Sequence, residues 1–174
     1  MRNFSRKFFD KLSSEAESSE RGRQHWNIHA CFSESCQRFF NAIEPESYIR
    51  PHYHDSSQGS ELLVGIRGHL KVVFFDSHGS ISNIVDLMPG LNQSDYSAAV
   101  EIPAFSYHTV ISFSPGSILL EVKNGPYVPS KAKKFAPWAP EESGDAGSDY
   151  LRELISRTNS FLNFHLDGKQ CENS

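Results

Sequence analysis

The sequence has few cysteines and no long apolar run. Its cysteines, Cys31, Cys36 and Cys171, are odd in number and lack zinc-finger spacing, which argues against a disulfide framework or a finger-type metal site. No stretch approaches the ~20 apolar residues of a membrane span. Residues 1–10 carry charges where a signal peptide needs an apolar core. We expect a cytoplasmic protein with reduced, buried thiols; pairing or metal ligation by Cys31 and Cys36 is the less favoured alternative.

An excess of positive charge is also absent. The formal net charge is −4, and both signs are mixed along the chain, so nucleic acid is not an expected partner. The short basic cluster at 131–134 is interpreted as a solvated loop. With 174 residues, 38% hydrophobic content and 13 phenylalanines, the chain is long enough for one domain with a substantial core.

Two histidines one residue apart are the most informative feature that is present. In an extended segment, His52 and His54 point to the same face, about 6.6 Å apart along the strand. Glu61 begins an apolar segment of strand length, 61–67, and Gly68 permits a tight turn into a second such segment, 69–75. The carboxylate is therefore expected beside the two histidines.

His108 begins a β-branched run that follows a turn at Pro103. Together with His52, His54 and Glu61 it would supply three imidazoles and one carboxylate. That set suits one divalent transition metal, zinc, iron, manganese or nickel, with positions left open if the ion is five- or six-coordinate.

The remaining pattern predicts three parts. Apolar residues at helical spacing favour an amphipathic helix over 3–20, within an arm of residues 1–24. Short strands punctuated by turns follow over 25–130, as in a sandwich or small barrel. Residues 131–174 read as a proline-rich segment, a helix over 149–157 and a polar tail.

The histidine pair, Glu61 and Gly68 resemble the first sequence motif of the cupins, and Pro103 to His108 resembles the second. The chain departs from that pattern in having six residues between His54 and Glu61 and a phenylalanine, Phe105, in place of a glycine. The resemblance implies an all-β fold, a double-stranded β-helix or jelly-roll barrel closed around the metal, with an N-terminal helix and a C-terminal helical extension.

A narrower resemblance covers most of the chain. The runs 21–29, 37–43, 47–54, 121–127 and 135–142 are similar to signature runs of the WbuC-type cupin-fold metalloproteins, small bacterial proteins often encoded among polysaccharide genes. It implies a metal-binding protein in surface polysaccharide biosynthesis but no particular reaction. Cupin relatives are commonly homodimers, and the segment 27–32 would be the strand that pairs across subunits.

Alternation along the histidine strand suggests ligand contacts. If His52 and His54 face inward, Tyr48 and Arg50 should do so too, and an inward arginine beside an open-coordinated ion favours an anionic or polyhydroxy small-molecule ligand. The alternative is a bulged or edge strand in which Arg50 pairs with a surface carboxylate. Three residues are expected to point away from the ligands: Tyr53, Tyr107 and Thr109.

Glu121 and Lys123 share one face of an apolar run. Facing inward they would serve as acid and base at the pocket; facing outward they would form an exposed ion pair. The family runs also contain residues that the resemblance implies for substrate binding: Arg38, Asn41 and Tyr127. Two more residues in these runs, Asn27 and His29, would belong either to the site or to a subunit contact.

Two classes of function fit these residues. In the first, the ion polarises a carbonyl or hydroxyl oxygen while Glu121 or Lys123 moves a proton, giving isomerase, epimerase or lyase chemistry; iron would instead permit dioxygenase chemistry. In the second, the pocket binds a small molecule without turnover.

Overall fold

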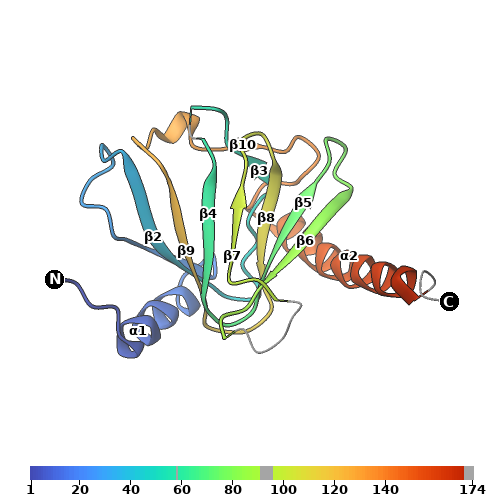
Figure 1. The fold of residues 1–174 in the computed structure, drawn as a ribbon, viewed down its shortest axis with the longest axis horizontal. Helices are drawn as coiled ribbons and strands as arrows, with labels where there is room; N and C mark the ends of the chain where they lie inside the picture. Colours follow the sequence, from blue (N-terminus) through green and yellow to red (C-terminus); the bar gives the residue numbers. More distant parts are fainter. Residues whose placement is uncertain (58, 91–95, 171–174) are drawn as a thin grey trace.

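The structure is a computed structural model that describes residues 1–57, 59–90 and 96–170. Its ten strands form two five-stranded sheets, in the orders β1-β2-β9-β4-β7 and β10-β3-β8-β5-β6. All strand pairs within the sheets are antiparallel. The sheets face each other as a jelly roll between two terminal helices (Figure 1), which confirms the predicted fold class.

The elements follow one another along the chain in this order: α1 Arg6–Glu17, β1 Arg23–Asn27, β2 Cys36–Ile43, β3 His52–Tyr53, β4 Glu61–Arg67, β5 Leu70–Phe75, β6 Ile81–Leu87, β7 Ala99–Ile102, β8 Tyr107–Ser112, β9 Ser117–Asn124, a 3-10 turn Pro129–Lys131, β10 Lys134–Phe135 and α2 Asp145–Gln170.

The hairpin of β4 and β5 matches the predicted segments closely. Gly68 joins the two strands with φ +79°, a conformation that L side chains rarely adopt, and a Cβ there would collide with the side chain of Ser117. Glu61 is the first residue of β4. The turn at Gly68 therefore sets the register of β4, which has Glu61 at its other end.

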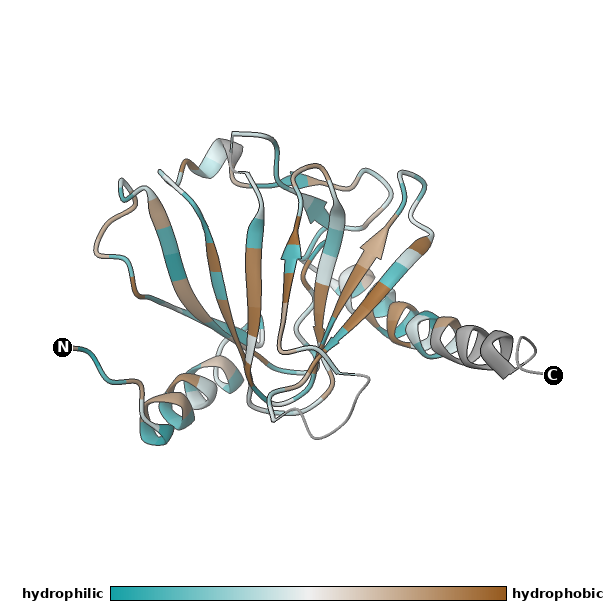
Figure 2. Cartoon of the chain, in the orientation of Figure 1, coloured by the Kyte–Doolittle hydropathy of each residue, from teal (hydrophilic) through white to brown (hydrophobic). Residues whose placement is uncertain are grey.

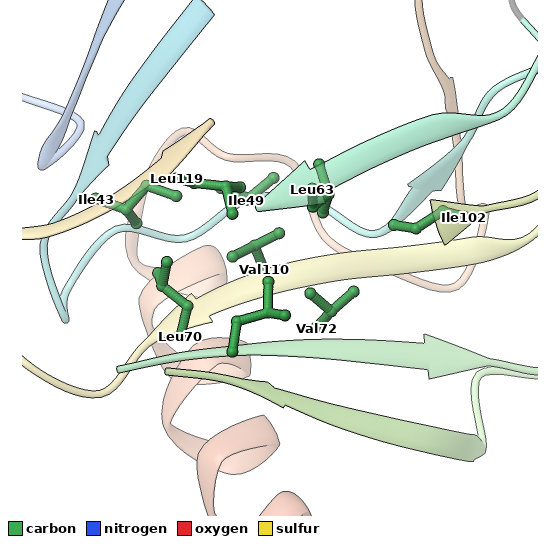
Figure 3. Close-up of a cluster of buried hydrophobic side chains, with 9 residues drawn as sticks. Ile43, Ile49, Leu63, Leu70, Val72, Ile102, Val110 and Leu119 are labelled. Atoms are coloured by element: carbon green, nitrogen blue, oxygen red, sulfur yellow. The ribbon is translucent and has the colours of Figure 1, made fainter. Parts of the chain in front are cut away.

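Alternation along the strands divides apolar from polar residues, visible as bands of both colours in Figure 2. Between the sheets lies a core of buried aliphatic side chains (Figure 3). Burying each such side chain contributes about 1.5–3 kcal/mol, so this cluster is a main source of stability. Its members are Ile43, Ile49, Leu63, Leu70, Val72, Leu87, Ile102, Val110 and Leu119.

Helix α1 covers the outer face of the first sheet (Figure 1). It is shorter than the expected 3–20, because Ser5 caps its start by accepting a hydrogen bond from the Phe8 amide. Phe8 packs edge-on against Trp26 and Phe40, with ring centroids 5.1 and 5.9 Å apart. The predicted apolar face thus docks on the barrel.

Helix α2 covers the outer face of the second sheet. It begins at Asp145 and runs well beyond the expected 149–157. Leu151 and Leu154 are buried in a cluster with Val73, Phe75 and Ile111, which point outward from β5 and β8. No helix in the described part of the chain is long and apolar enough to cross a membrane.

Three expectations about the connecting segments need adjustment. The barrel takes in β1 from Arg23 and β10 at Lys134–Phe135, beyond the expected limits of 25 and 130. The segment expected to pair across subunits, 27–32, lies in β1 only at Asn27 and then turns. Cys31 and Cys36 are free, as expected, but exposed rather than buried, while Cys171 lies outside the described residues.

Candidate metal centre

Three histidine side chains converge inside the barrel. His52 lies in β3 opposite His108 of β8 in the strand register, and His54 follows just after β3. All three side chains are between 3% and 5% exposed. One ring nitrogen from each lies within 4.8 Å of the others, an arrangement that can hold a metal ion.

A backbone carbonyl orients each ring. The Nδ1 atoms lie 2.9 Å from the Arg50 oxygen for His52, 2.5 Å from the Ala132 oxygen for His54 and 2.9 Å from the Ser106 oxygen for His108. Because a carbonyl only accepts, each Nδ1 must carry the proton and donate it. A neutral ring then presents the Nε2 lone pair, and this second layer of hydrogen bonds is typical of metal-binding histidines.

Burial also keeps His52 neutral. Desolvation lowers the pKa of its imidazole well below the usual value, and the nearby charge of Lys133 adds to that effect. The ring is therefore neutral at pH 7, with one proton on Nδ1 and the Nε2 lone pair available to a metal.

Glu61 completes the cluster in spite of the long loop before it. Its Oε1 lies 2.8 Å from His108 Nε2 and 3.0 Å from His54 Nε2, and the side chain is buried. Burial opposes ionisation of this carboxyl, but hydrogen bonds and positive charge from His108 and His54, which need a cation at each Nε2, hold its pKa well below its ordinary value. With neutral rings, the carboxylate oxygen would instead face two nitrogen lone pairs.

Such an arrangement requires a cation, either protons on the rings or a metal ion. His54 Nε2 and Glu61 Oε1 are buried and have no hydrogen-bond partner, although they lie 3.0 Å apart. For metal–ligand bonds of about 2.1 Å, two ligand atoms are about 3.0 Å apart at a right angle and about 3.4 Å apart in a tetrahedron. The observed spacings of 2.8 and 3.0 Å are short enough for Glu61, His54 and His108 to hold one ion together.

A cavity of about 600 Å³ adjoins the metal centre. His52, Glu61 and His108 line it on one side. Residues of β1, β2 and β9 and of the segment after β9 line most of the rest, together with Ile49, Leu63 and Val110 of the core. This volume is typical of small-molecule sites.

Glu121 and Lys123 face this cavity. Lys123 lies opposite Glu61 in the register of β9 and β4, so the pair shares the inner face of the sheet. The Lys123 ammonium is 3.8 Å from the Glu121 carboxylate and 5.2 Å from the centre of the Phe39 ring. Asn41 donates from Nδ2 to Glu121 Oε1 at 3.1 Å and also lines the cavity.

The other predicted ligand contacts divide into two groups. Tyr127 lines the cavity, and its ring centroid is 5.1 Å from that of Phe32, which also lines it. Arg38 does not, because it lies between the cavity-lining residues Gln37 and Phe39 on β2 and pairs with Glu34 at 2.8 Å. The structure brings Tyr127 to the pocket and keeps Arg38 out of it.

Tyr48 and Arg50 do not face the ligand histidines. Strand β3 has only two residues, so the alternation that would carry them inward does not extend to them. The Tyr48 hydroxyl donates to the Pro140 carbonyl at 3.0 Å. The Arg50 guanidinium lies 4.0 Å from the exposed carboxylate of Glu141, as in the surface-pairing alternative. The Arg50 carbonyl oxygen orients His52.

The residues expected to point away do so. The ring centroid of Tyr107 is 4.9 Å from that of Tyr53 and 6.0 Å from that of Trp138. Thr109 donates to the Ile49 carbonyl at 2.5 Å. These side chains pack the outer layer of the second sheet.

Lys133 is a cavity residue that the sequence reading assigned to a solvated loop. It lines the cavity directly after Ala132, whose carbonyl orients His54. Burial lowers the pKa of its amine to about 8, and the neighbouring charge of Lys123 contributes. Lys133 reaches the cavity because β10 pairs with β3, where Phe135 lies opposite His52. No local sequence pattern predicts that pairing.

Phe105 occupies a conformation that favours glycine. Its φ is +65°, and its amide donates to the His54 carbonyl at 2.8 Å. The side chain is 61% exposed. The turn that leads to His108 therefore keeps the backbone shape of a glycine turn without the glycine, at a steric cost.

Comparison with known proteins supports the fold. The model of a family described as a domain of unknown function (DUF6016) matches residues 4–87. No curated protein matches the chain. Among solved structures, oxalate oxidase in complex with the substrate analogue glycolate is similar at 14% identity with a TM-score of 0.50, over 69% of this chain and 58% of that one. The chain thus spans little more than half of that relative.

Two smaller solved proteins are also similar. KdgF from Halomonas sp. aligns at 15% identity with a TM-score of 0.49, over 65% of this chain and 88% of that one. A cupin superfamily protein from Desulfitobacterium hafniense aligns at 15% identity with a TM-score of 0.47, over 65% and 86%. At such identities the likeness concerns the fold alone. The chain has a cupin jelly roll with a buried three-histidine cluster.

Proposed function

We propose that this protein is a metal-binding cupin that acts on a small anionic or sugar-related molecule held in the cavity between its sheets. The observation that carries the proposal is the set of three buried imidazoles, each fixed by a carbonyl, around the unpartnered oxygen of Glu61. A bound divalent ion would act there as a Lewis acid on a carbonyl or hydroxyl oxygen.

The residues of the chain itself would do the rest. The cavity residues Asn41 and Tyr127 would hold the ligand, and Lys133 would attract its negative charge. Glu121 would accept a proton from a carbon–hydrogen bond of the ligand, and Lys123, 3.8 Å away, would stabilise the carboxylate or return a proton. This assignment favours isomerase, epimerase or lyase chemistry.

The sequence runs that resemble WbuC-type cupins support a narrower family assignment. Many of the cavity-lining residues lie in the runs that resemble WbuC-type cupins, among them Asn27, His29, Asn41 and Tyr127. We therefore assign the protein to that type, with a role in surface polysaccharide biosynthesis. The free thiols of Cys31 and Cys36 support a reducing, cytoplasmic compartment.

A homodimer is the assembly we assign. Strand β1 is at the edge of its sheet and pairs only with β2 among the described strands, and an open edge can pair with a second chain. Light scattering coupled to gel filtration should give twice the chain mass of 19.6 kDa, whereas a mass equal to one chain would contradict the dimer.

Metal analysis tests the centre. Purified protein should contain about one divalent ion per chain, and His52→Ala and His108→Ala should each lose it. His78 is exposed in a turn, so His78→Ala is the matched control and should retain full occupancy. Retention by the two site variants would refute the metal centre, and bound iron together with oxygen uptake would favour dioxygenase chemistry.

Non-catalytic binding is the second candidate. The Glu121 carboxylate already has two partners, the Lys123 ammonium and the Asn41 amide, so it can serve as a structural group instead of a base. Incubating the metal-loaded protein with a panel of sugars and sugar acids in heavy water separates the two candidates. Proton abstraction should place deuterium on carbon, detected by NMR, and Glu121→Gln should abolish the exchange. Binding without any exchange across the panel would support the non-catalytic function.

A further inference from the structure

Asn41 presents an unpaired hydrogen-bond acceptor to the cavity. Its Nδ2 donates to Glu121 Oε1 at 3.1 Å, and because a carboxylate only accepts, the amide nitrogen must lie on that side. The opposite atom, Oδ1, is buried without a partner, and the side chain is only 3% exposed. This oxygen requires a donor.

His29 presents a second unpartnered polar atom on the same wall. The Arg38 carbonyl already accepts from the amides of Ile28 and His29 at 2.8 and 3.3 Å. His29 Nδ1 lies 2.9 Å from the Arg38 carbonyl oxygen and 3.1 Å from the Arg38 amide nitrogen, so the backbone of Arg38 occupies Nδ1 and leaves Nε2 for another partner. That atom is buried without a partner, and the side chain, 6% exposed, lines the cavity.

Lys133 supplies an unpaired positive charge. Its amine makes no hydrogen bond or ion pair with any residue that the structure describes. The other cavity charges include two that already have partners, since Arg23 bonds Glu142 and Lys123 lies beside Glu121. With a divalent ion at the histidines, the cavity has an excess of positive charge, which favours an anion.

These three groups require different properties of one ligand. A simple carboxylate would satisfy Lys133 but cannot donate to Asn41. A neutral polyol would satisfy Asn41 and His29 but would leave the lysine unpaired. A cavity of about 600 Å³ has room for a molecule that carries both kinds of group.

We propose that the cavity binds a hydroxylated acid, with the anionic group between the metal centre and Lys133 and hydroxyl groups on the wall of β1, β2 and β9. Asn41 is the residue that distinguishes such a ligand from an unsubstituted acid. This inference rests on the proposed function and assigns its ligand class. A site built to bond a hydroxyl rejects an analogue that lacks it, because a buried polar group is then left without a partner.

Two probes of equal length test the proposal. Gluconate and hexanoate share a six-carbon chain and a carboxylate, but only gluconate carries hydroxyls. Calorimetric titration of the zinc-loaded protein should give at least about tenfold tighter binding of gluconate. Asn41→Leu should bring the two affinities to within about threefold, and Lys133→Met should weaken both by a similar factor and preserve their ratio.

Each remaining outcome decides against the inference. Equal affinities in the unmodified protein, no binding of either probe, or an unchanged preference in Asn41→Leu would overturn it. If Asn41→Leu fails to fold, Asn41→Ala and Lys133→Met still give the ratio of gluconate affinity to hexanoate affinity. Zinc content measured on the same samples distinguishes this failure from failure of the metal centre, because full occupancy without gluconate selectivity rejects only the ligand class.

Discussion

The barrel interior changes from aliphatic at one end to polar at the other along the same strands, and Ile49, Leu63 and Val110 belong both to the core and to the cavity wall. On the inner face, β2, β9 and β4 each carry an aliphatic residue toward one end and a polar residue two positions away, toward the other. These neighbours are Ile43 and Asn41, Leu119 and Glu121, and Leu63 and Glu61. One end is a packed core (Figure 3), and the other contains the metal centre and the cavity.

The difference shows how this fold separates stability from chemistry. The aliphatic end contributes burial with no unmet polar group. The polar end leaves Asn41 Oδ1, His54 Nε2 and Glu61 Oε1 buried without partners, which costs stability until a metal or ligand satisfies them. Burial at the aliphatic end thus offsets the cost of the polar end. Substitutions at the aliphatic end should mainly lower the free energy of unfolding, and those at the polar end should mainly weaken metal binding.

Leu63 and Glu61, two positions apart on β4, give the largest contrast in stability. Leu63→Ala should lower the free energy of unfolding of the metal-free protein by about 2–5 kcal/mol, because it leaves a cavity in the core. Glu61→Gln should lower it by less than about 1 kcal/mol or raise it, since a buried charge is removed. Urea unfolding followed by circular dichroism measures both, and equal losses would break the contrast.

The same two variants should reverse their order when metal affinity is measured. Glu61→Gln removes a charged ligand and should weaken zinc binding by about 100-fold, at the upper end of the range known for changes near a metal. Leu63→Ala should change it less than about threefold. Competition against a chromophoric chelator gives both values, and unchanged affinity in Glu61→Gln would exclude that carboxylate as a ligand.

The charge of Lys133 should make anion binding at the polar end depend on pH. Its pKa of about 8 is set by burial and by Lys123, and is opposed by Glu121, Glu61 and Glu142. Below pH 8 the amine is charged and binds the anion. Above pH 8 it loses its proton, so affinity for gluconate should fall by up to about tenfold as the pH rises to 9.5.

Lys133→Arg is the matched control for this pH dependence. Arginine stays charged throughout the range, so the fall in affinity should disappear. An identical fall in the variant would assign the pH dependence to another group.

Phe105 offers the smallest effect and concerns the turn that positions His108. Phe105→Gly should relieve the steric cost of φ +65° and raise the free energy of unfolding by up to about 1 kcal/mol, because the greater freedom of glycine in the unfolded chain offsets part of the gain. Thermal unfolding measures the change. A clear loss of stability would mean that the contact of Phe105 with the Tyr53 ring, at 5.9 Å, outweighs the strain.

Most of the correct sequence-based predictions came from the spacing of residues close together in the chain. The β4–β5 hairpin, the terminal helices and the convergence of His52, His54 and His108 were predictable, because strand alternation and turn residues act over a few positions. The face of Glu121 and Lys123 was not, since alternation gives a shared face but not its direction. The pairing of Lys123 with Glu61 decides it.

Contacts between distant segments account for what the sequence did not reveal. Alternation failed for Tyr48 and Arg50 because β3 ends after two residues. Lys133 was missed because β10 joins β3 from a segment about eighty positions away. The partners of Asn41 and His29 depend on β1, β2 and β9 lying side by side, which a single sequence does not report.

X-ray absorption at the metal edge of zinc-loaded protein tests the central claim most directly. It should show three imidazole nitrogens and at least one oxygen, with bonds of about 2.0–2.2 Å, and this zinc signal should be lost in His108→Ala. Sulfur ligands, or an unchanged spectrum in that variant, would place the ion elsewhere and contradict a metal centre built by His52, His54, His108 and Glu61.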